Sequence, residues 1–214
     1  MRTIEGVLFE PVGCLAEFPA GPFNEIAFRL FDRKKRPARS GSRSYWHLLN
    51  VIELAGKEFT AAEKEILETL ELQAVEGASA YEDVMPALSE LRSMHTRLAI
   101  ASSLSGVAVR RFLDKFSLQE FFAEVWNRDN AGGIKTAPLG RAINSVSLDP
   151  QQIIFLSDTD EGLKVAKEAG VNSVLMMNYY EESRRLAMHD PAGGIVSLHE
   201  LPDFIRLVAA ENTR

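Results

Sequence analysis

Hydrophobic residues recur in two different patterns along the chain. A short apolar run at residues 3–10, ended by Pro11 and Gly13, predicts a buried strand. Over about the next 65 residues the spacing becomes helical. Three apolar stripes there predict three helices, and they consist of Phe23, Ile26, Ala27, Leu30 and Phe31; Trp46, Leu48, Leu49, Ile52 and Leu54; and Ile66, Leu67, Leu70 and Leu72. Thr60 and Glu63 have the spacing of a capping box, which predicts the start of the third helix.

From Tyr81 onwards, short apolar runs alternate with helical stripes. The predicted strands are 98–101, 122–126, 153–156, 174–177 and 195–196, and the predicted helices are 84–91, 107–116, 139–146, 161–169 and 201–210. Strands separated by helices of about ten residues are typical of βαβ units and a parallel sheet. We therefore expect an α/β protein with a Rossmann-like parallel sheet built from residues 1–15 and 82–214, and a separate helical domain inserted at 16–81.

Composition and charge exclude several classes of partner. Acidic residues outnumber basic ones by 30 to 24, and this net charge of −6 argues against general nucleic-acid binding. No apolar run approaches the roughly 18 residues that a membrane span needs. The single cysteine, Cys14, allows no disulfide within the chain, and the N-terminus does not resemble a secretion signal, so we expect a cytoplasmic location with no membrane partner. The sequence carries no signal for an oligomeric state.

Candidate chemistry lies where the predicted strands end, because ligands of parallel sheets bind at the carboxyl ends of the strands. The first strand is followed by Glu10-Pro11-Val12-Gly13-Cys14-Leu15, the second by Ser102 and Ser103, and the strand 153–156 by Asp158. Lys135 lies in a loop before Pro138. The alternative for each residue alone is that it caps the following helix.

Taken together and in this order, these segments resemble the four motifs of the haloacid dehalogenase superfamily, and the helical insert resembles its C1 cap. The resemblance implies a Mg²⁺-dependent phosphatase of small phosphorylated metabolites. It places Glu10 in the nucleophile slot and Val12 in the acid/base slot, while Ser102 and Lys135 would hold the phosphoryl oxygens. It also implies that Glu10, the Val12 carbonyl and Asp158 ligate Mg²⁺, and that Ser103 contacts the substrate.

The sequence departs from the family pattern at the residues that carry the chemistry. Glu10 stands where the family has Asp, and a displacement of roughly 1 Å can cost on the order of 100-fold in rate. Val12 cannot transfer a proton, which typically costs about 10²–10⁴-fold. Gly162 occupies the slot of a further acid, where Asp160 and Glu161 either substitute or simply favour the helix N-terminus. We therefore expect weak or absent Mg²⁺ binding, and either a weak hydrolase or a non-catalytic protein that binds an anion or a protein partner.

A basic stretch lies between the first two predicted helices of the insert. Six of the eleven residues from Arg33 to Arg43 are Lys or Arg. By the resemblance, Arg39 and Arg43 face the site and bind the anionic substrate. The alternative is a solvated helix end, where cations are favoured, and the absence of interleaved aromatic residues argues against nucleic acid.

Overall fold

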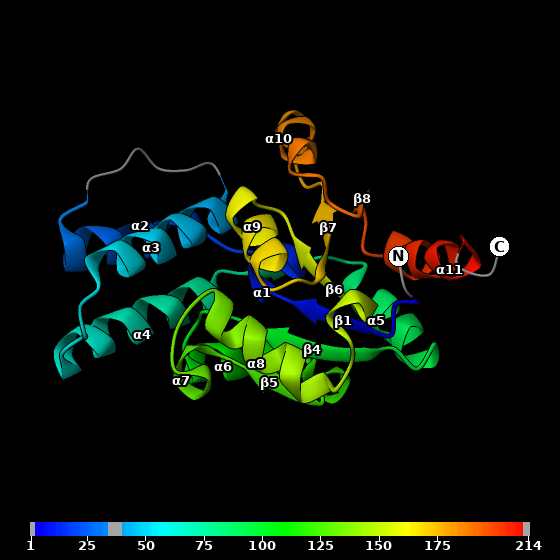
Figure 1. Cartoon of the computed structure of the whole chain (residues 1–214). Coiled ribbons are helices and arrows are strands. Elements are labelled where there is room, and N and C mark those ends of the chain that lie inside the picture. Colours follow the sequence, from blue (N-terminus) through cyan, green and yellow to red (C-terminus); the bar gives the residue numbers. More distant parts are fainter. Residues whose placement is uncertain (1–2, 34–39, 212–214) are drawn as a thin grey trace.

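The structure is a computed structural model that describes residues 3–33 and 40–211. Its centre is a six-stranded sheet in the order β5-β4-β1-β6-β7-β8, and every neighbouring pair of strands in it is parallel (Figure 1). The strands are β1 (Gly6–Phe9), β4 (Arg97–Ala101), β5 (Glu124–Trp126), β6 (Ile153–Ser157), β7 (Asn172–Met176) and β8 (Gly193–Ile195). The expected parallel α/β sheet is therefore confirmed.

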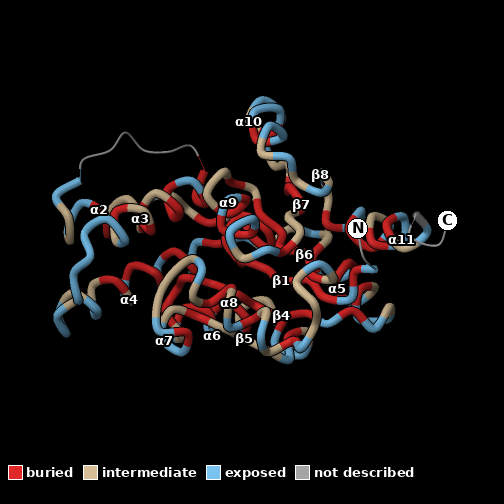
Figure 2. Tube along the Cα trace, in the orientation of Figure 1, coloured by how far each residue is buried: buried red, intermediate tan, exposed pale blue. Residues whose placement is uncertain are grey.

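Helices surround this sheet as the alternation of the sequence predicts, although the sequence did not predict the short helices at 128–131 and 180–186. Those of the sheet domain are α5 (Val84–Ser93), α6 (Gly106–Phe116), α7 (Arg128–Ala131), α8 (Thr136–Val146), α9 (Asp160–Glu168), α10 (Tyr180–Leu186) and α11 (Glu200–Glu211). Helix α8 packs on β4 and β5, and α9 packs on β6 and β7. Single-turn 3₁₀ helices cover Gln119–Phe121, Pro150–Gln152 and Ala187–His189. Strands β1 and β6 are buried along their whole length, as apolar runs covered on both faces must be (Figure 2).

Three long helices lie between β1 and β4 in the chain and form a group at one end of the sheet (Figure 1). They are α2 (Ala20–Phe31), α3 (Gly41–Ala55) and α4 (Ala61–Glu76), and we call them the helical insert. Thr60 and Glu63 form the expected capping box at the start of α4. The two connections to the sheet pair as short antiparallel strands, β2 (Ala16–Glu17) and β3 (Ser79–Ala80). The domain boundaries at 16 and 81 stay a prediction.

The helical insert also packs against the sheet domain. Helix α4 packs against α6 of the sheet domain, and Phe18 stacks on Phe112 with ring centroids 5.6 Å apart. Lys115 of α6 donates hydrogen bonds to the carbonyls of Val75, Glu76 and Ala78 at the end of α4.

Within the described ranges, no helix combines the length and the apolar character needed to cross a bilayer.

Candidate functional site

Three predicted site residues follow three adjacent strands at the centre of the sheet. Glu10 follows β1, Ser102 follows β4 and Asp158 follows β6, and these strands are neighbours in the order β4-β1-β6. Because the strands are parallel, their carboxyl ends meet at one edge. The structure therefore brings the three side chains to the same edge, as expected.

The Glu10 carboxyl is enclosed by hydrogen-bond donors. Only 2% of the residue is exposed. The Ser102 hydroxyl donates to Oε1 over 2.7 Å, and the Tyr45 hydroxyl donates to Oε2 over 2.8 Å. The backbone N–H of Ser103 points at the same place, 3.3 Å from Oε2 and 2.9 Å from the Tyr45 oxygen. Both oxygens of Glu10 are thus engaged, and one of the donors, Tyr45, comes from α3 of the helical insert.

Burial changes the acidity of this carboxyl. Desolvation raises the pKa of Glu10 to about 7, against the opposing effect of the hydrogen bonds from Ser102, Tyr45 and Ser103. Near neutral pH a large fraction of Glu10 is therefore protonated. A protonated carboxyl is neither a nucleophile nor a metal ligand.

The second acid, Asp158, also receives a donor from α3. The Ser42 hydroxyl donates to Asp158 Oδ2 over 2.6 Å, and the Asn178 amide donates to the same oxygen over 3.1 Å. The other oxygen, Oδ1, is buried and has no hydrogen-bond partner among the described residues. Desolvation raises the pKa of Asp158 to about 6, although the bonds from Ser42 and Asn178 oppose this.

The turn between Glu10 and β2 is shaped around Asp158. Short helix α1 (Pro11–Cys14) is interrupted at Val12 and at Gly13, whose φ is +84°. A Cβ atom on Gly13 would lie 2.5 Å from Asp158 Oδ2, so this position requires glycine for both space and conformation. The Val12 side chain is fully buried and carries no proton to transfer. The metal-ligand role of its carbonyl stays a prediction.

Gly162 stands where the family pattern has a further acid, and packing leaves no room for a side chain at this position. A Cβ atom on Gly162 would lie 1.9 Å from the Ser157 hydroxyl oxygen. The neighbouring acids are engaged elsewhere, since Asp160 contacts Lys164 at 2.8 Å and His189 at 2.5 Å, and Glu161 accepts a hydrogen bond from Asn50. Asp160 and Glu161 therefore interact with surface and insert residues in this arrangement.

Lys135 is placed differently from what the family resemblance implies. Its backbone N–H donates to the Ser103 hydroxyl over 2.7 Å, which fixes the loop beside the site. Its ammonium group, however, donates to the side chains of Asn50 and Glu53 on α3. In the described part of the chain no ion pair joins Lys135 to Glu10. The lysine therefore bonds the sheet domain to the helical insert.

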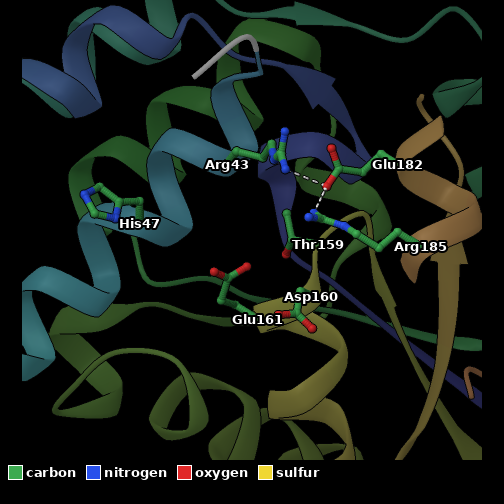
Figure 3. Close-up of a pocket in the computed structure, with 7 residues that line it drawn as sticks. All are labelled: Arg43, His47, Thr159, Asp160, Glu161, Glu182 and Arg185. Atoms are coloured by element: carbon green, nitrogen blue, oxygen red, sulfur yellow. Dashed lines mark hydrogen bonds and ion pairs between the residues drawn. The ribbon is translucent and has the colours of Figure 1, made fainter. Parts of the chain in front are cut away.

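The two predicted cap arginines have different outcomes. Arg39 lies outside the described residues. Arg43 forms an ion pair with Glu182 at 2.8 Å, and Arg185 contacts the same carboxylate at 2.5 Å (Figure 3). Arg43 borders a pocket of about 460 Å³ between α3, α9 and α10, and the other residues that line it are His47, Thr159, Asp160, Glu161, Glu182 and Arg185. Arg43 thus faces a pocket, but one that Glu10 does not line.

The sequence did not single out Tyr45, Ser42 or Asn178. Tyr45 is one of the buried residues of α3, so its sequence position indicates only a core residue. Ser42 lies in the first turn of the same helix. Their contacts join residues 35 and 116 positions apart, and no local pattern encodes such pairs. A hydroxyl on an otherwise buried helix face was the one available signal, because buried hydroxyls require partners.

These residues do not fit a tight Mg²⁺ site. Magnesium requires near-octahedral oxygen ligands. Here both Glu10 oxygens and Asp158 Oδ2 already accept hydrogen bonds, and of these four carboxylate oxygens only Asp158 Oδ1 has no partner within the described part of the chain. Among the described residues, no group of three or more His, Cys, Asp or Glu side chains is arranged to hold a metal ion.

Comparison with known proteins identifies a family whose model covers more than half of the chain. The model of the haloacid dehalogenase-like hydrolase family matches residues 46–176. A phosphoglycolate phosphatase of Cereibacter sphaeroides is 26% identical over 134 residues, which are 62% of this chain and 60% of the relative. The chain thus spans about 60% of the length of that curated relative.

Solved structures agree on the fold. A haloacid dehalogenase-like hydrolase from Streptococcus pneumoniae superposes with a TM-score of 0.71 at 16% identity, covering 95% of this chain and 99% of the other. A predicted phosphoglycolate phosphatase from Haemophilus somnus superposes with a TM-score of 0.68 at 18% identity and the same coverage. At these identities the likeness concerns the fold alone.

Proposed function

This chain belongs to the haloacid dehalogenase-like hydrolase family, and from that membership we propose that it is a phosphatase-type member with weak or absent activity towards small phosphorylated metabolites. One observation carries the proposal. The nucleophile position holds Glu10, whose carboxyl is bonded to Ser102 and to Tyr45 of the helical insert. Phosphorus chemistry at this carboxyl requires that those bonds be broken first.

The chemistry of the two substituted positions points the same way. In-line attack requires a carboxylate held within a few tenths of an ångström of the productive geometry. The longer Glu10 is held instead by donors on both of its oxygens. The buried Val12 offers no proton to an alkoxide leaving group, which costs about 10²–10⁴-fold. The two costs do not simply add, because nucleophile and acid/base act as a unit.

Mg²⁺ binding is weak under this proposal. Family phosphatases use the metal to offset the charge of the phosphoryl group. In this chain Glu10 and Asp158 would hold it, with the Val12 carbonyl, but burial raises the pKa of both acids and their oxygens accept hydrogen bonds from neutral donors.

The test is a panel of phosphoesters assayed with Mg²⁺. We expect negligible hydrolysis of glycerol phosphate and at most slow turnover of p-nitrophenyl phosphate and acetyl phosphate, whose leaving groups need no proton. The double variant Glu10→Asp/Val12→Asp should hydrolyse glycerol phosphate at least about 100-fold faster than the native chain. The matched control Glu10→Asp/Val12→Asn has the same size but no acid, and should not. Native turnover of a sugar phosphate at roughly 1–10³ s⁻¹ would contradict the proposal.

A second candidate is a non-catalytic protein that binds a small anion. The pocket beside Arg43 and Arg185 favours it, because both guanidinium groups contact one carboxylate, and their side chains are 45% and 63% exposed. Each guanidinium carries five N–H donors, so both retain donors for a ligand. A panel of small carboxylates, tested by thermal shift with the native chain and with Arg43→Gln, decides this candidate. Stabilisation that Arg43→Gln abolishes supports it, and the absence of any stabilisation contradicts it.

A further inference from the structure

We infer that the donors of Ser102 and Ser103 at the strand ends form an anion site in this chain, and that the chain's own Glu10 side chain fills it, with Tyr45 as its cover. The inference rests on the proposed function, because it explains what the donors that would hold a phosphoryl group do in this protein. It makes Glu10 an internal substitute for a bound oxyanion.

The donors at this place form an arrangement suited to an anion. A hydroxyl from Ser102, a phenol from Tyr45 and the backbone N–H of Ser103 converge on one carboxyl group over 2.7, 2.8 and 3.3 Å. Ser102 itself is fixed by the N–H of Leu104, which donates to its hydroxyl oxygen over 3.2 Å. All four residues are buried, so these donors are preorganised and shielded from water.

The length of the Glu10 side chain lets it occupy this site. An aspartate in its place would be one methylene shorter, which shortens the reach of the side chain by roughly 1 Å. Glu10 extends from the end of β1 to the donors at the end of β4, the neighbouring strand. A phosphate would need the same donors and the same space as the Glu10 carboxyl group. The Glu10 carboxyl and a phosphate therefore exclude each other.

The helical insert covers the filled site. Tyr45 is 1% exposed and packs against Phe23, with ring centroids 5.2 Å apart. Two more contacts from the same helix close over the site, since Ser42 donates to Asp158 and Asn50 accepts from Lys135. Helix α3 thus bonds to Glu10, Lys135 and Asp158, and its Tyr45 also accepts a hydrogen bond from the N–H of Ser103, so it contacts all four predicted segments.

Binding of inorganic phosphate, followed by thermal shift and by calorimetry, tests the inference. The native chain and Glu10→Gln, which fills the same space, should show no saturable phosphate binding up to about 10 mM, a concentration that would nearly fill a site with a Kd of about 1 mM. Glu10→Ala should bind phosphate at least about tenfold more tightly than the native chain. Glu10→Ala/Ser102→Ala should lose that gain, which shows that the ion occupies the strand-end site and not the pocket beside Arg43.

A second variant keeps the test decisive if the cavity left by Glu10→Ala destabilises the fold. Glu10→Asp withdraws the carboxyl without a large cavity, and it should also bind phosphate more tightly than the native chain does. Glu76→Ala, which removes an exposed partner of Arg111, is the control and should behave as the native chain. Equal phosphate binding by the native chain and Glu10→Ala would overturn the inference, as would no gain in either Glu10→Ala or Glu10→Asp. The readout involves no turnover, so failure of the hydrolysis panel and failure here are separate results.

Discussion

The guanidinium group of Arg128 on α7 donates to both carboxyl oxygens of Glu71 on α4, over 2.6 and 3.1 Å. Glu71 is 2% exposed, and it also accepts a hydrogen bond from the N–H of Ser105 over 3.0 Å. The same guanidinium donates to the carbonyl of Ser103. One buried ion pair therefore joins the helical insert to the loop that follows Ser102.

Removing the cation of this pair should strongly destabilise the fold. Arg128→Leu leaves the Glu71 carboxyl buried without its cation, and breaking a buried pair in this way costs about 3–5 kcal/mol. We expect the free energy of unfolding, measured by urea denaturation, to fall by about that amount. Arg128→Leu/Glu71→Leu should recover part of the loss, because it removes both charges.

The matched control is the exposed pair between Arg111 and Glu76, which also joins the insert to the sheet domain. Both side chains are about half exposed, at 50% and 52%. Arg111→Leu should therefore leave the free energy of unfolding nearly unchanged. Equal effects of the two substitutions would show that the buried pair has no special role in joining the insert.

The stability of the chain should depend on pH through Glu10. Its pKa is raised from 4.5 to about 7 by burial, so the folded state holds this proton more strongly than the unfolded state does. The resulting stabilisation is complete below about pH 4.5 and is lost as the pH rises through about 7. Between pH 5 and pH 8 the native chain should lose about 2–3 kcal/mol from this group.

Glu10→Gln isolates this contribution, because glutamine has the same size and does not titrate. Urea denaturation at pH 5, 6, 7 and 8, with EDTA present to remove metal ions, should give a shallower pH dependence for Glu10→Gln than for the native chain. The raised pKa of Asp158 contributes equally to both proteins and cancels in the difference. Parallel curves would mean that the Glu10 pKa is not raised.

The sequence predicts the strands of the central sheet but not the short elements β2, β3 and α10, and the reasons are physical. Buried strands such as β1 and β6 are continuous apolar runs, and such runs are visible without tertiary information. Strands β2 and β3 have two residues each, too few for any period to be recognised. Helix α10, which was not predicted, begins after Asn178 and carries charged residues in both turns with no apolar stripe.

The candidate site also contains residues that the sequence can predict and contacts that it cannot. Glu10, Ser102 and Asp158 could be found because each follows a recognisable strand and parallel strands end at one edge. The contacts of Tyr45 and Ser42 could not be found, because they depend on how α3 packs over that edge. The direction of the Lys135 ammonium group depends on the same packing.

Mg²⁺ should bind only weakly to the native chain. Glu10 is partly protonated near neutral pH, and Asp158 offers one oxygen that accepts no hydrogen bond from the residues that the structure describes. Isothermal calorimetry at pH 7 should show no saturable binding at micromolar Mg²⁺. Asp158→Asn should give the same weak signal, since the site it removes is not occupied at that concentration. Micromolar or tighter binding by the native chain, lost in Asp158→Asn, would contradict this expectation.

Gly162 offers a sharper test of why the family's further acid is missing. A Cβ atom at this position would lie 1.9 Å from the Ser157 hydroxyl oxygen and 2.8 Å from the Ser157 Cβ atom. Gly162→Ala therefore overpacks the start of α9 and should lower the free energy of unfolding by about 1–3 kcal/mol. Gly140→Ala is the matched control, because Gly140 is also helical and a Cβ there meets nothing within 4 Å. That substitution should be neutral or stabilise the chain by up to about 1 kcal/mol.

Ser157→Gly/Gly162→Ala removes both close contacts and should recover most of the loss. Ser157 and Gly162 then have to change together before an acid can return to this slot. If Gly162→Ala alone is as stable as Gly140→Ala, packing does not explain the missing acid, and Gly162→Asp should be tolerated without any change at Ser157.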